Sequence, residues 1–76
     1  MKELLIYIVE NLVDHPEEIK VIESERDGEI ILELHVAQDD IGKVIGRQGR
    51  IAKEIRTIVR SMASRTGVRI SVEIAG

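Results

Sequence analysis

The stretch IGKVIGRQGRI, residues 41–51, decides the fold of this chain. Two glycines three positions apart, Gly46 and Gly49, stand directly before a helical pattern, where they let the backbone turn sharply without a Cβ in the way. Such a turn leaves the first N–H groups of the following helix facing outwards, and these groups, with the positive end of the helix dipole, can bind a phosphate. Between the glycines, Arg47 can donate two N–H groups to phosphodiester oxygens, and Gln48 can donate to a phosphate or a sugar.

Three segments have the alternation of apolar and polar side chains that is typical of half-buried strands. They are residues 18–25, where the alternation is weak, residues 29–36, and residues 68–74. Between the first two, Asp27-Gly28 favours a type I′ hairpin turn. We therefore expect a sheet with one face on the core and the other largely in water.

Three further segments have the apolar spacing of amphipathic helices. They are residues 2–13, a short segment from Asp39 and Asp40 through Ile45, and a longer one from Arg50 to Arg65. The two aspartates suit the cap and the dipole of the short helix. In the longer helix, Ile55, Ile58 and Val59 are expected to pack in the core. For Val44 and Ile45, which precede the glycines, the sequence leaves two roles open: packing in the core or lining an exposed groove. The predicted order is α-β-β-α-α-β in a single domain, residues 1–76.

The charge of the chain is divided between its two halves. The net charge is −3 over 76 residues, but residues 1–40 carry −9 and residues 41–76 carry +6. The basic side chains of the longer helix form one stripe that starts at the glycine turn: Arg50, Lys53, Arg56 and Arg60. Because one sign dominates the stripe, it favours a nucleic-acid backbone over a face that is merely solvated.

Composition excludes several classes of protein. Without cysteine the chain forms neither a disulfide nor a thiolate metal site. Tyr7 is the only aromatic residue, so the sequence argues against modules that stack bases on aromatic side chains. The two histidines, His15 and His35, lack metal-ligand spacing, and no catalytic constellation is present. We therefore expect a protein that binds neither a metal nor a cofactor and that is not an enzyme. No apolar run reaches the roughly 18 residues that cross a bilayer, so the expected location is the cytoplasm.

Taken alone, the two glycines favour a tight turn between two helices that binds no ligand. The glycine turn and the element order together, however, resemble a KH domain. The signature of that family is a GxxG loop between two helices, preceded by an apolar pair, and VIGRQG at residues 44–49 is similar to it. The order of elements resembles the bacterial type II arrangement, an α+β fold in which helices pack on one face of a three-stranded sheet. The closest resemblance is to the small bacterial single-KH RNA-binding proteins of the KhpA type, and it covers essentially the whole chain. Ala52 stands where many eukaryotic KH domains have a large aliphatic residue, and Ile51 precedes it.

The resemblance implies a non-enzymatic protein that binds single-stranded RNA with low sequence selectivity, as a post-transcriptional regulator or RNA chaperone. The GxxG loop would clamp the sugar–phosphate backbone of about four nucleotides, and the bases would lie on an aliphatic groove. The residues expected to bind RNA are Lys43, Val44, Ile45, Gly46, Arg47, Gln48, Gly49, Arg50, Ile51 and Lys53.

An alternative function is that of a dimerisation or adaptor subunit. The apolar arc of the helix over residues 2–13 spans about 200°, which is wider than the roughly 100° that one packed face needs. Ile22 and Ile31 also face away from the core side of their strands. The resemblance implies a homodimer, or a complex with a larger KH-containing protein. The simpler interpretation is that these apolar residues complete a small core.

Overall fold

The computed structural model describes residues 1–75, so Gly76, the last residue of the predicted domain, lies outside the described residues. The helices and strands are α1 (Lys2–Glu10), β1 (Lys20–Arg26), β2 (Glu29–His35), α2 (Ile41–Ile45), α3 (Arg50–Ser64) and β3 (Ile70–Ile74). Single 3₁₀ turns occupy Pro16–Glu18, Gln38–Asp40 and Arg47–Gly49. The predicted order α-β-β-α-α-β is confirmed.

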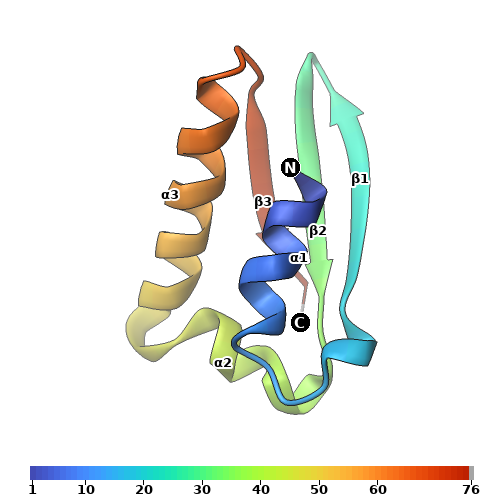
Figure 1. Cartoon of the computed structure of the whole chain (residues 1–76), viewed down its shortest axis with the longest axis vertical. Coiled ribbons are helices and arrows are strands. Elements are labelled where there is room, and N and C mark those ends of the chain that lie inside the picture. Colours follow the sequence, from blue (N-terminus) through green and yellow to red (C-terminus); the bar gives the residue numbers. More distant parts are fainter. Residues whose placement is uncertain (76) are drawn as a thin grey trace.

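The three strands form one mixed sheet in the order β1-β2-β3. β1 and β2 pair antiparallel, and both central residues of their connection have positive φ, 53° at Asp27 and 80° at Gly28, as a type I′ turn requires. β2 and β3 pair parallel, with Ile30 opposite Ile70. The connection between parallel strands must cross the sheet, and α2 and α3 lie on this crossover. Figure 1 shows α1 and α3 on the same face of the sheet.

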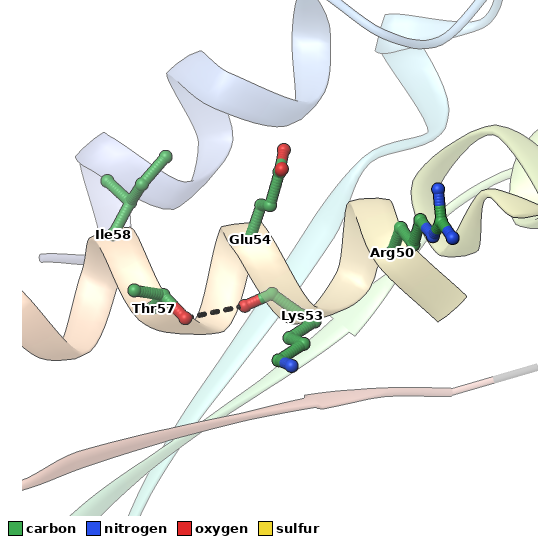
Figure 2. A pocket seen from close by; sticks show the side chains of 5 residues that line it. All are labelled: Arg50, Lys53, Glu54, Thr57 and Ile58. Atoms are coloured by element: carbon green, nitrogen blue, oxygen red, sulfur yellow. Dashed lines mark hydrogen bonds between the residues drawn. The ribbon is translucent and has the colours of Figure 1, made fainter. Parts of the chain in front are cut away.

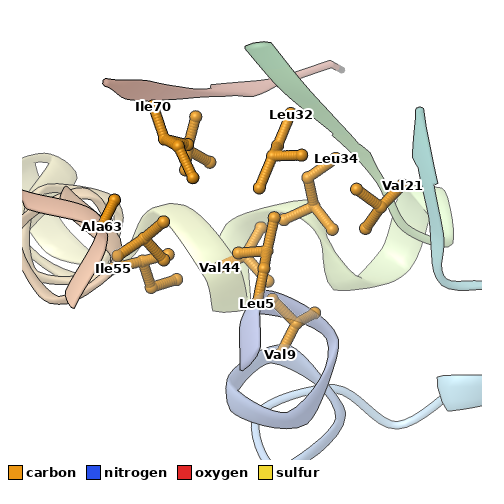
Figure 3. Packing of buried hydrophobic residues seen from close by; sticks show 11 residues of the cluster. Leu5, Val9, Val21, Leu32, Leu34, Val44, Ile55, Ala63 and Ile70 are labelled. Carbon is orange, nitrogen blue, oxygen red and sulfur yellow. The ribbon is translucent and has the colours of Figure 1, made fainter. Parts of the chain in front are cut away.

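The core lies between this face and the helices. Figure 3 shows side chains from the sheet opposite those from the helices. The buried cluster consists of Leu5, Val9, Val21, Leu32, Leu34, Val44, Ile55, Val59, Ala63, Ile70 and Val72. The apolar positions of β2 and β3 that alternate in the sequence therefore point into the core, as the period of two predicts.

The first helix is shorter than predicted. It ends at Glu10 rather than at residue 13, because the side-chain amide of Asn11 donates to the carbonyl of Tyr7 at 2.7 Å. The N–H groups of Leu12 and Val13 then share the carbonyl of Val9 as acceptor. Leu12 and Val13 still pack against the core from this irregular turn.

Ile58 does not pack in the core, and the prediction for it was wrong. Its side chain is 46% exposed, whereas Ile55 is 2% exposed and Val59 is fully buried. The buried line on α3 runs through Ala52, Ile55, Val59 and Ala63, and Ile58 lies at the edge of this line. The buried stripe is narrower than the apolar spacing in the sequence suggests. The spacing therefore wrongly placed Ile58 inside it.

The two apolar residues on the outer face of the sheet differ in exposure. Ile31 is buried because it lies on the central strand between Ser24 and Ser71. Ile22, on an edge strand, is 40% exposed. Within residues 1–75, no helix combines the length and the apolar character needed to cross a membrane.

Candidate functional site

The glycine turn begins where α2 ends. Gly46 has φ 75° and ψ 177°, a conformation that essentially only glycine adopts. A Cβ placed on Gly46 would lie 2.3 Å from Cγ1 of Ile51 and 3.0 Å from its backbone nitrogen. The first glycine is therefore required both by its backbone conformation and by the close approach of α3.

Residues 47–49 form one tight turn before α3. Gln48 and Gly49 both have left-handed conformations, with φ 57° and 73°. The N–H of Gly49 donates to the carbonyl of Gly46, and that of Arg50 donates to the carbonyl of Arg47. A Cβ at Gly49 would meet no atom within 4 Å, so only its positive φ favours glycine there. Gln48 is not glycine, and its left-handed backbone stores strain at the tip of the turn.

The turn presents donors that the rest of the described chain does not use. Among residues 1–75, no side-chain hydrogen bond or ion pair involves the guanidinium of Arg47 or the amide of Gln48. The side chains of both residues are exposed. The positive end of the α3 dipole lies directly behind them, at Arg50. The turn therefore has the donors and the field that bind an anion.

The basic stripe on α3 divides into two parts. Arg50 and Lys53 are exposed and line a shallow surface groove of about 500 Å³ along α3, with Glu54, Thr57 and Ile58. Figure 2 shows Lys53 on one side of the helix and Glu54 and Ile58 on the other. Further along, the Nε–H of Arg56 donates to the carbonyl of Val72 at 3.1 Å and so ties α3 to β3. All four basic side chains of the stripe are exposed, but Arg56 is also engaged with β3, whereas Arg50 and Lys53 form no such bond within residues 1–75.

The apolar site residues separate into core and surface. Val44 is fully buried, so of its two possible roles the structure supports the core. Ile45 is 36% exposed, and Ile51 is half-buried against the core next to Gly46. Ile45 and Ile51 therefore remain as apolar surface beside the turn.

Lys43 has partners within the protein. Its ammonium contacts the carboxylates of Asp14 and Asp40. The side chain of Asp40 is fully buried. Its carboxylate oxygens accept hydrogen bonds from the backbone N–H groups of Asp14 at 3.1 Å and His15 at 2.9 Å. The predicted capping role of this side chain was wrong, because it makes no capping hydrogen bond to α2. Its acceptor role was not foreseen, since no side-chain pattern reveals distant backbone donors.

Both members of this ion pair have shifted pKa values. Burial acts to raise the pKa of Asp40, but the N–H groups of Asp14 and His15 and the ammonium of Lys43 outweigh it and hold the pKa below its ordinary value of 3.8. The carboxylates of Asp14 and Asp40 raise the pKa of Lys43 above its ordinary 10.5. The pair is therefore ionised at neutral pH.

Three side chains that offer metal ligands lie away from the turn. His15, Glu17 and Glu18 place ligand atoms within 4.8 Å of one another around the 3₁₀ turn Pro16–Glu18. Both glutamates are exposed, and nothing else at this position indicates an ion. The glycine turn remains the better candidate site.

Comparison with known proteins agrees with this arrangement. A family model described as "KhpA/KhpB, KH domain" matches residues 2–74. A protein of Chlamydia pneumoniae named RNA-binding protein KhpA is 55% identical over 74 residues, which are 97% of this chain and 95% of the relative. Relatives with the same name from Clostridium acetobutylicum and Listeria monocytogenes are 53% and 46% identical, over 97% of this chain and 99% and 97% of their own lengths.

A solved structure shares the fold at low sequence identity. The crystal structure of Era from Aquifex aeolicus, bound to GDP and aluminium fluoride, matches with a TM-score of 0.66 and 21% identity. The match covers 96% of this chain but only 28% of the Era chain. Fold, glycine turn and relatives thus agree: the chain belongs to the KhpA/KhpB family of KH domains and has the type II KH fold.

Proposed function

We propose that this protein binds single-stranded RNA by clamping its sugar–phosphate backbone with the GxxG turn, residues 46–49, and that it is not an enzyme. The observation that carries the proposal is the exposed turn itself, where the side chains of Arg47 and Gln48 lie open to solvent at the positive end of the α3 dipole. The names of its relatives, RNA-binding protein KhpA, support RNA as the ligand.

Each part of the turn has a role in this proposal. A phosphate accepts hydrogen bonds from the backbone N–H groups of Arg47 and Gln48 at the positive end of the α3 dipole. The guanidinium of Arg47 binds a phosphate with two N–H groups, and Arg50 and Lys53 extend the positive surface along α3.

The neighbouring apolar surface receives the bases. Ile45 and Ile51 offer it beside the turn, and Val44 supports them from the core. Phosphate contacts position the strand but carry no sequence information, so selectivity is low. Such binding suits a cytoplasmic RNA chaperone or post-transcriptional regulator.

The test is a charge reversal at the turn. We expect Arg47→Asp/Gln48→Asp to abolish binding of a single-stranded RNA oligonucleotide in a gel-shift assay and to leave the far-UV circular dichroism unchanged. The matched control is Arg65→Asp/Thr66→Asp, which makes the same change of charge at the opposite end of α3.

The salt dependence gives a second measurement. With about three phosphates bound, the affinity of the wild type should fall with a log–log slope near −2, from roughly −0.7 per phosphate on single strands. Equal RNA retention by the turn variant and the control variant would refute the proposal.

A second candidate function is self-association, or pairing with a larger KH-containing protein. It is favoured by exposed apolar side chains on the helices: Tyr7 on α1 is 64% exposed, and Ile58 and Met62 lie one turn apart on α3 at 46% and 41%. On this proposal the purified chain is a homodimer at tens of micromolar in analytical ultracentrifugation. Ile58→Asp/Met62→Asp should make it monomeric, while Thr57→Asp/Ser61→Asp on the adjacent face should not. A wild-type monomer would contradict self-association.

A further inference from the structure

A buried carboxylate lies close to the turn but outside the proposed RNA contacts. Asp40 is the one charged residue that is buried among residues 1–75. It immediately precedes α2, yet both of its backbone partners, Asp14 and His15, belong to the segment that follows α1. Lys43, one turn further along, contacts Asp40 at 3.2 Å and also contacts Asp14. These groups form a clamp between the end of α1 and the start of α2.

The clamp acts on the element that carries the turn. α2 has only five residues, Ile41–Ile45, and it leads directly into Gly46. A helix this short is not stable on its own, so tertiary contacts set its direction. Val44 in the core provides one such contact, and the clamp provides another. Rotation of α2 would therefore move the turn and also separate the buried carboxylate from its donors, which is costly.

Lys43 is held in place by the same contacts. Its ammonium has two carboxylate partners, whereas Arg47 forms no hydrogen bond or ion pair through its side chain within the described residues 1–75. Two of the three N–H donors of the ammonium are directed at Asp14 and Asp40, so these carboxylates fix the position of Lys43. Lys43 and Arg47 thus differ in how their positive groups are held within the protein.

We propose that Asp40 and Lys43 are positioning residues: together they orient α2 so that the turn faces the RNA, and Lys43 acts through Asp14 and Asp40 rather than by contacting a phosphate. This inference rests on the proposed binding of RNA at residues 46–49. It assigns a role to the buried carboxylate and changes the role that the sequence predicts for Lys43.

The salt dependence of RNA affinity separates positioning from contact. Removal of a side chain that contacts a phosphate should make the log–log slope shallower by about 0.7. We expect this change for Arg47→Met. For Lys43→Met we expect an affinity loss of about tenfold at every salt concentration with the slope unchanged. A slope made shallower by Lys43→Met, as by Arg47→Met, would overturn the inference.

Asp40→Asn gives the second arm, with Asp39→Asn as the matched control. Both variants remove one negative charge, but Asp39 is exposed. We expect Asp40→Asn to weaken binding without a change of slope, and Asp39→Asn to leave binding equal to or slightly tighter than that of the wild type. Because both residues belong to one clamp, the double variant Asp40→Asn/Lys43→Met should bind no more weakly than the worse single variant. Additive losses would contradict the clamp.

A measurement without RNA keeps the inference testable by itself. In ¹⁵N–¹H spectra, Asp40→Asn should shift the amide signals of Gly46 and Gly49 and speed their hydrogen exchange, whereas Asp39→Asn should not. If Asp40→Asn does not fold, Lys43→Met serves instead. The side chain of Lys43 is partly exposed, so its replacement is better tolerated by the fold. Unmoved glycine amides would refute the positioning role. Unchanged affinity and slope for Arg47→Met would refute RNA binding at the turn and leave the spectroscopic result to decide on the clamp.

Discussion

The two glycines of the turn should differ sharply in their tolerance of alanine. Gly46→Ala forces a side chain into a conformation that favours glycine, at a cost of about 1–3 kcal/mol. The new Cβ also lies 2.3 Å from Cγ1 and 2.8 Å from Cβ of Ile51. Overpacking of this kind adds about 1–3 kcal/mol. The sum of about 2–6 kcal/mol is a large part of the roughly 4–11 kcal/mol expected for a domain of this length.

Gly49→Ala is the matched control. The φ of Gly49 is also positive, but its Cβ would meet no atom within 4 Å, so the cost is the backbone strain alone, about 1–2 kcal/mol. Urea denaturation followed by circular dichroism gives both free energies of unfolding. We expect Gly46→Ala to be the less stable variant by at least about 1 kcal/mol. Equal free energies for the two variants would refute the role of close packing at Gly46.

The contact with Ile51 can be tested within the same experiment. Ile51→Ala removes Cγ1, the nearest atom, but retains Cβ and the backbone nitrogen. Gly46→Ala should therefore cost less in the Ile51→Ala background, with a coupling of about 1 kcal/mol or more. If the costs of Gly46→Ala and Ile51→Ala are strictly additive, the overpacking at Gly46 does not come from Cγ1 of Ile51.

Three further predictions concern stability. Gln48→Gly should raise the free energy of unfolding by about 1 kcal/mol in urea denaturation, because it relieves a left-handed backbone; a loss of stability would contradict this. Ile55→Ala should cost about 2–4 kcal/mol and Ile58→Ala less than about 1 in the same assay, and similar costs would refute the difference in burial. The folded-state pKa of Asp40 lies below its unfolded value, so its contribution to stability is fully present above the unfolded value of 3.8 and is lost as the pH falls through the folded value. Acid titration of Asp40→Asn should therefore show a flatter decline below pH 3.8 than that of the wild type, and parallel curves would contradict the shift.

The order of elements was predictable because each signal was local. Alternation with a period of two fixes which residues of β2 and β3 point inward, and the Asp27-Gly28 turn sets the hairpin. The exposure of Ile58 was not predictable, since it depends on how much of α3 its neighbours cover.

The glycine turn was recognised in the sequence, but the difference between its glycines was not. Gly46 meets Ile51 only after α3 has formed and packed. Asp40 was recognised as an acid before a helix, the usual sign of a cap. Its acceptor role was hidden because its donors are backbone N–H groups 25 and 26 positions away, which no side-chain pattern marks.

The parallel pairing of β2 with β3 has a consequence for the order of folding. The hairpin β1–β2 closes over two residues, whereas Ile30 and Ile70 are partners forty positions apart. Closing a loop of that length costs about 3 kcal/mol of chain entropy before the new contacts form. The hairpin should thus form early and β3 should dock late.

The turn at residues 46–49 lies on the segment that this late step closes. A nascent chain that has not yet produced β3 would therefore lack the strand against which α3, the helix that follows the turn, is packed and hydrogen-bonded.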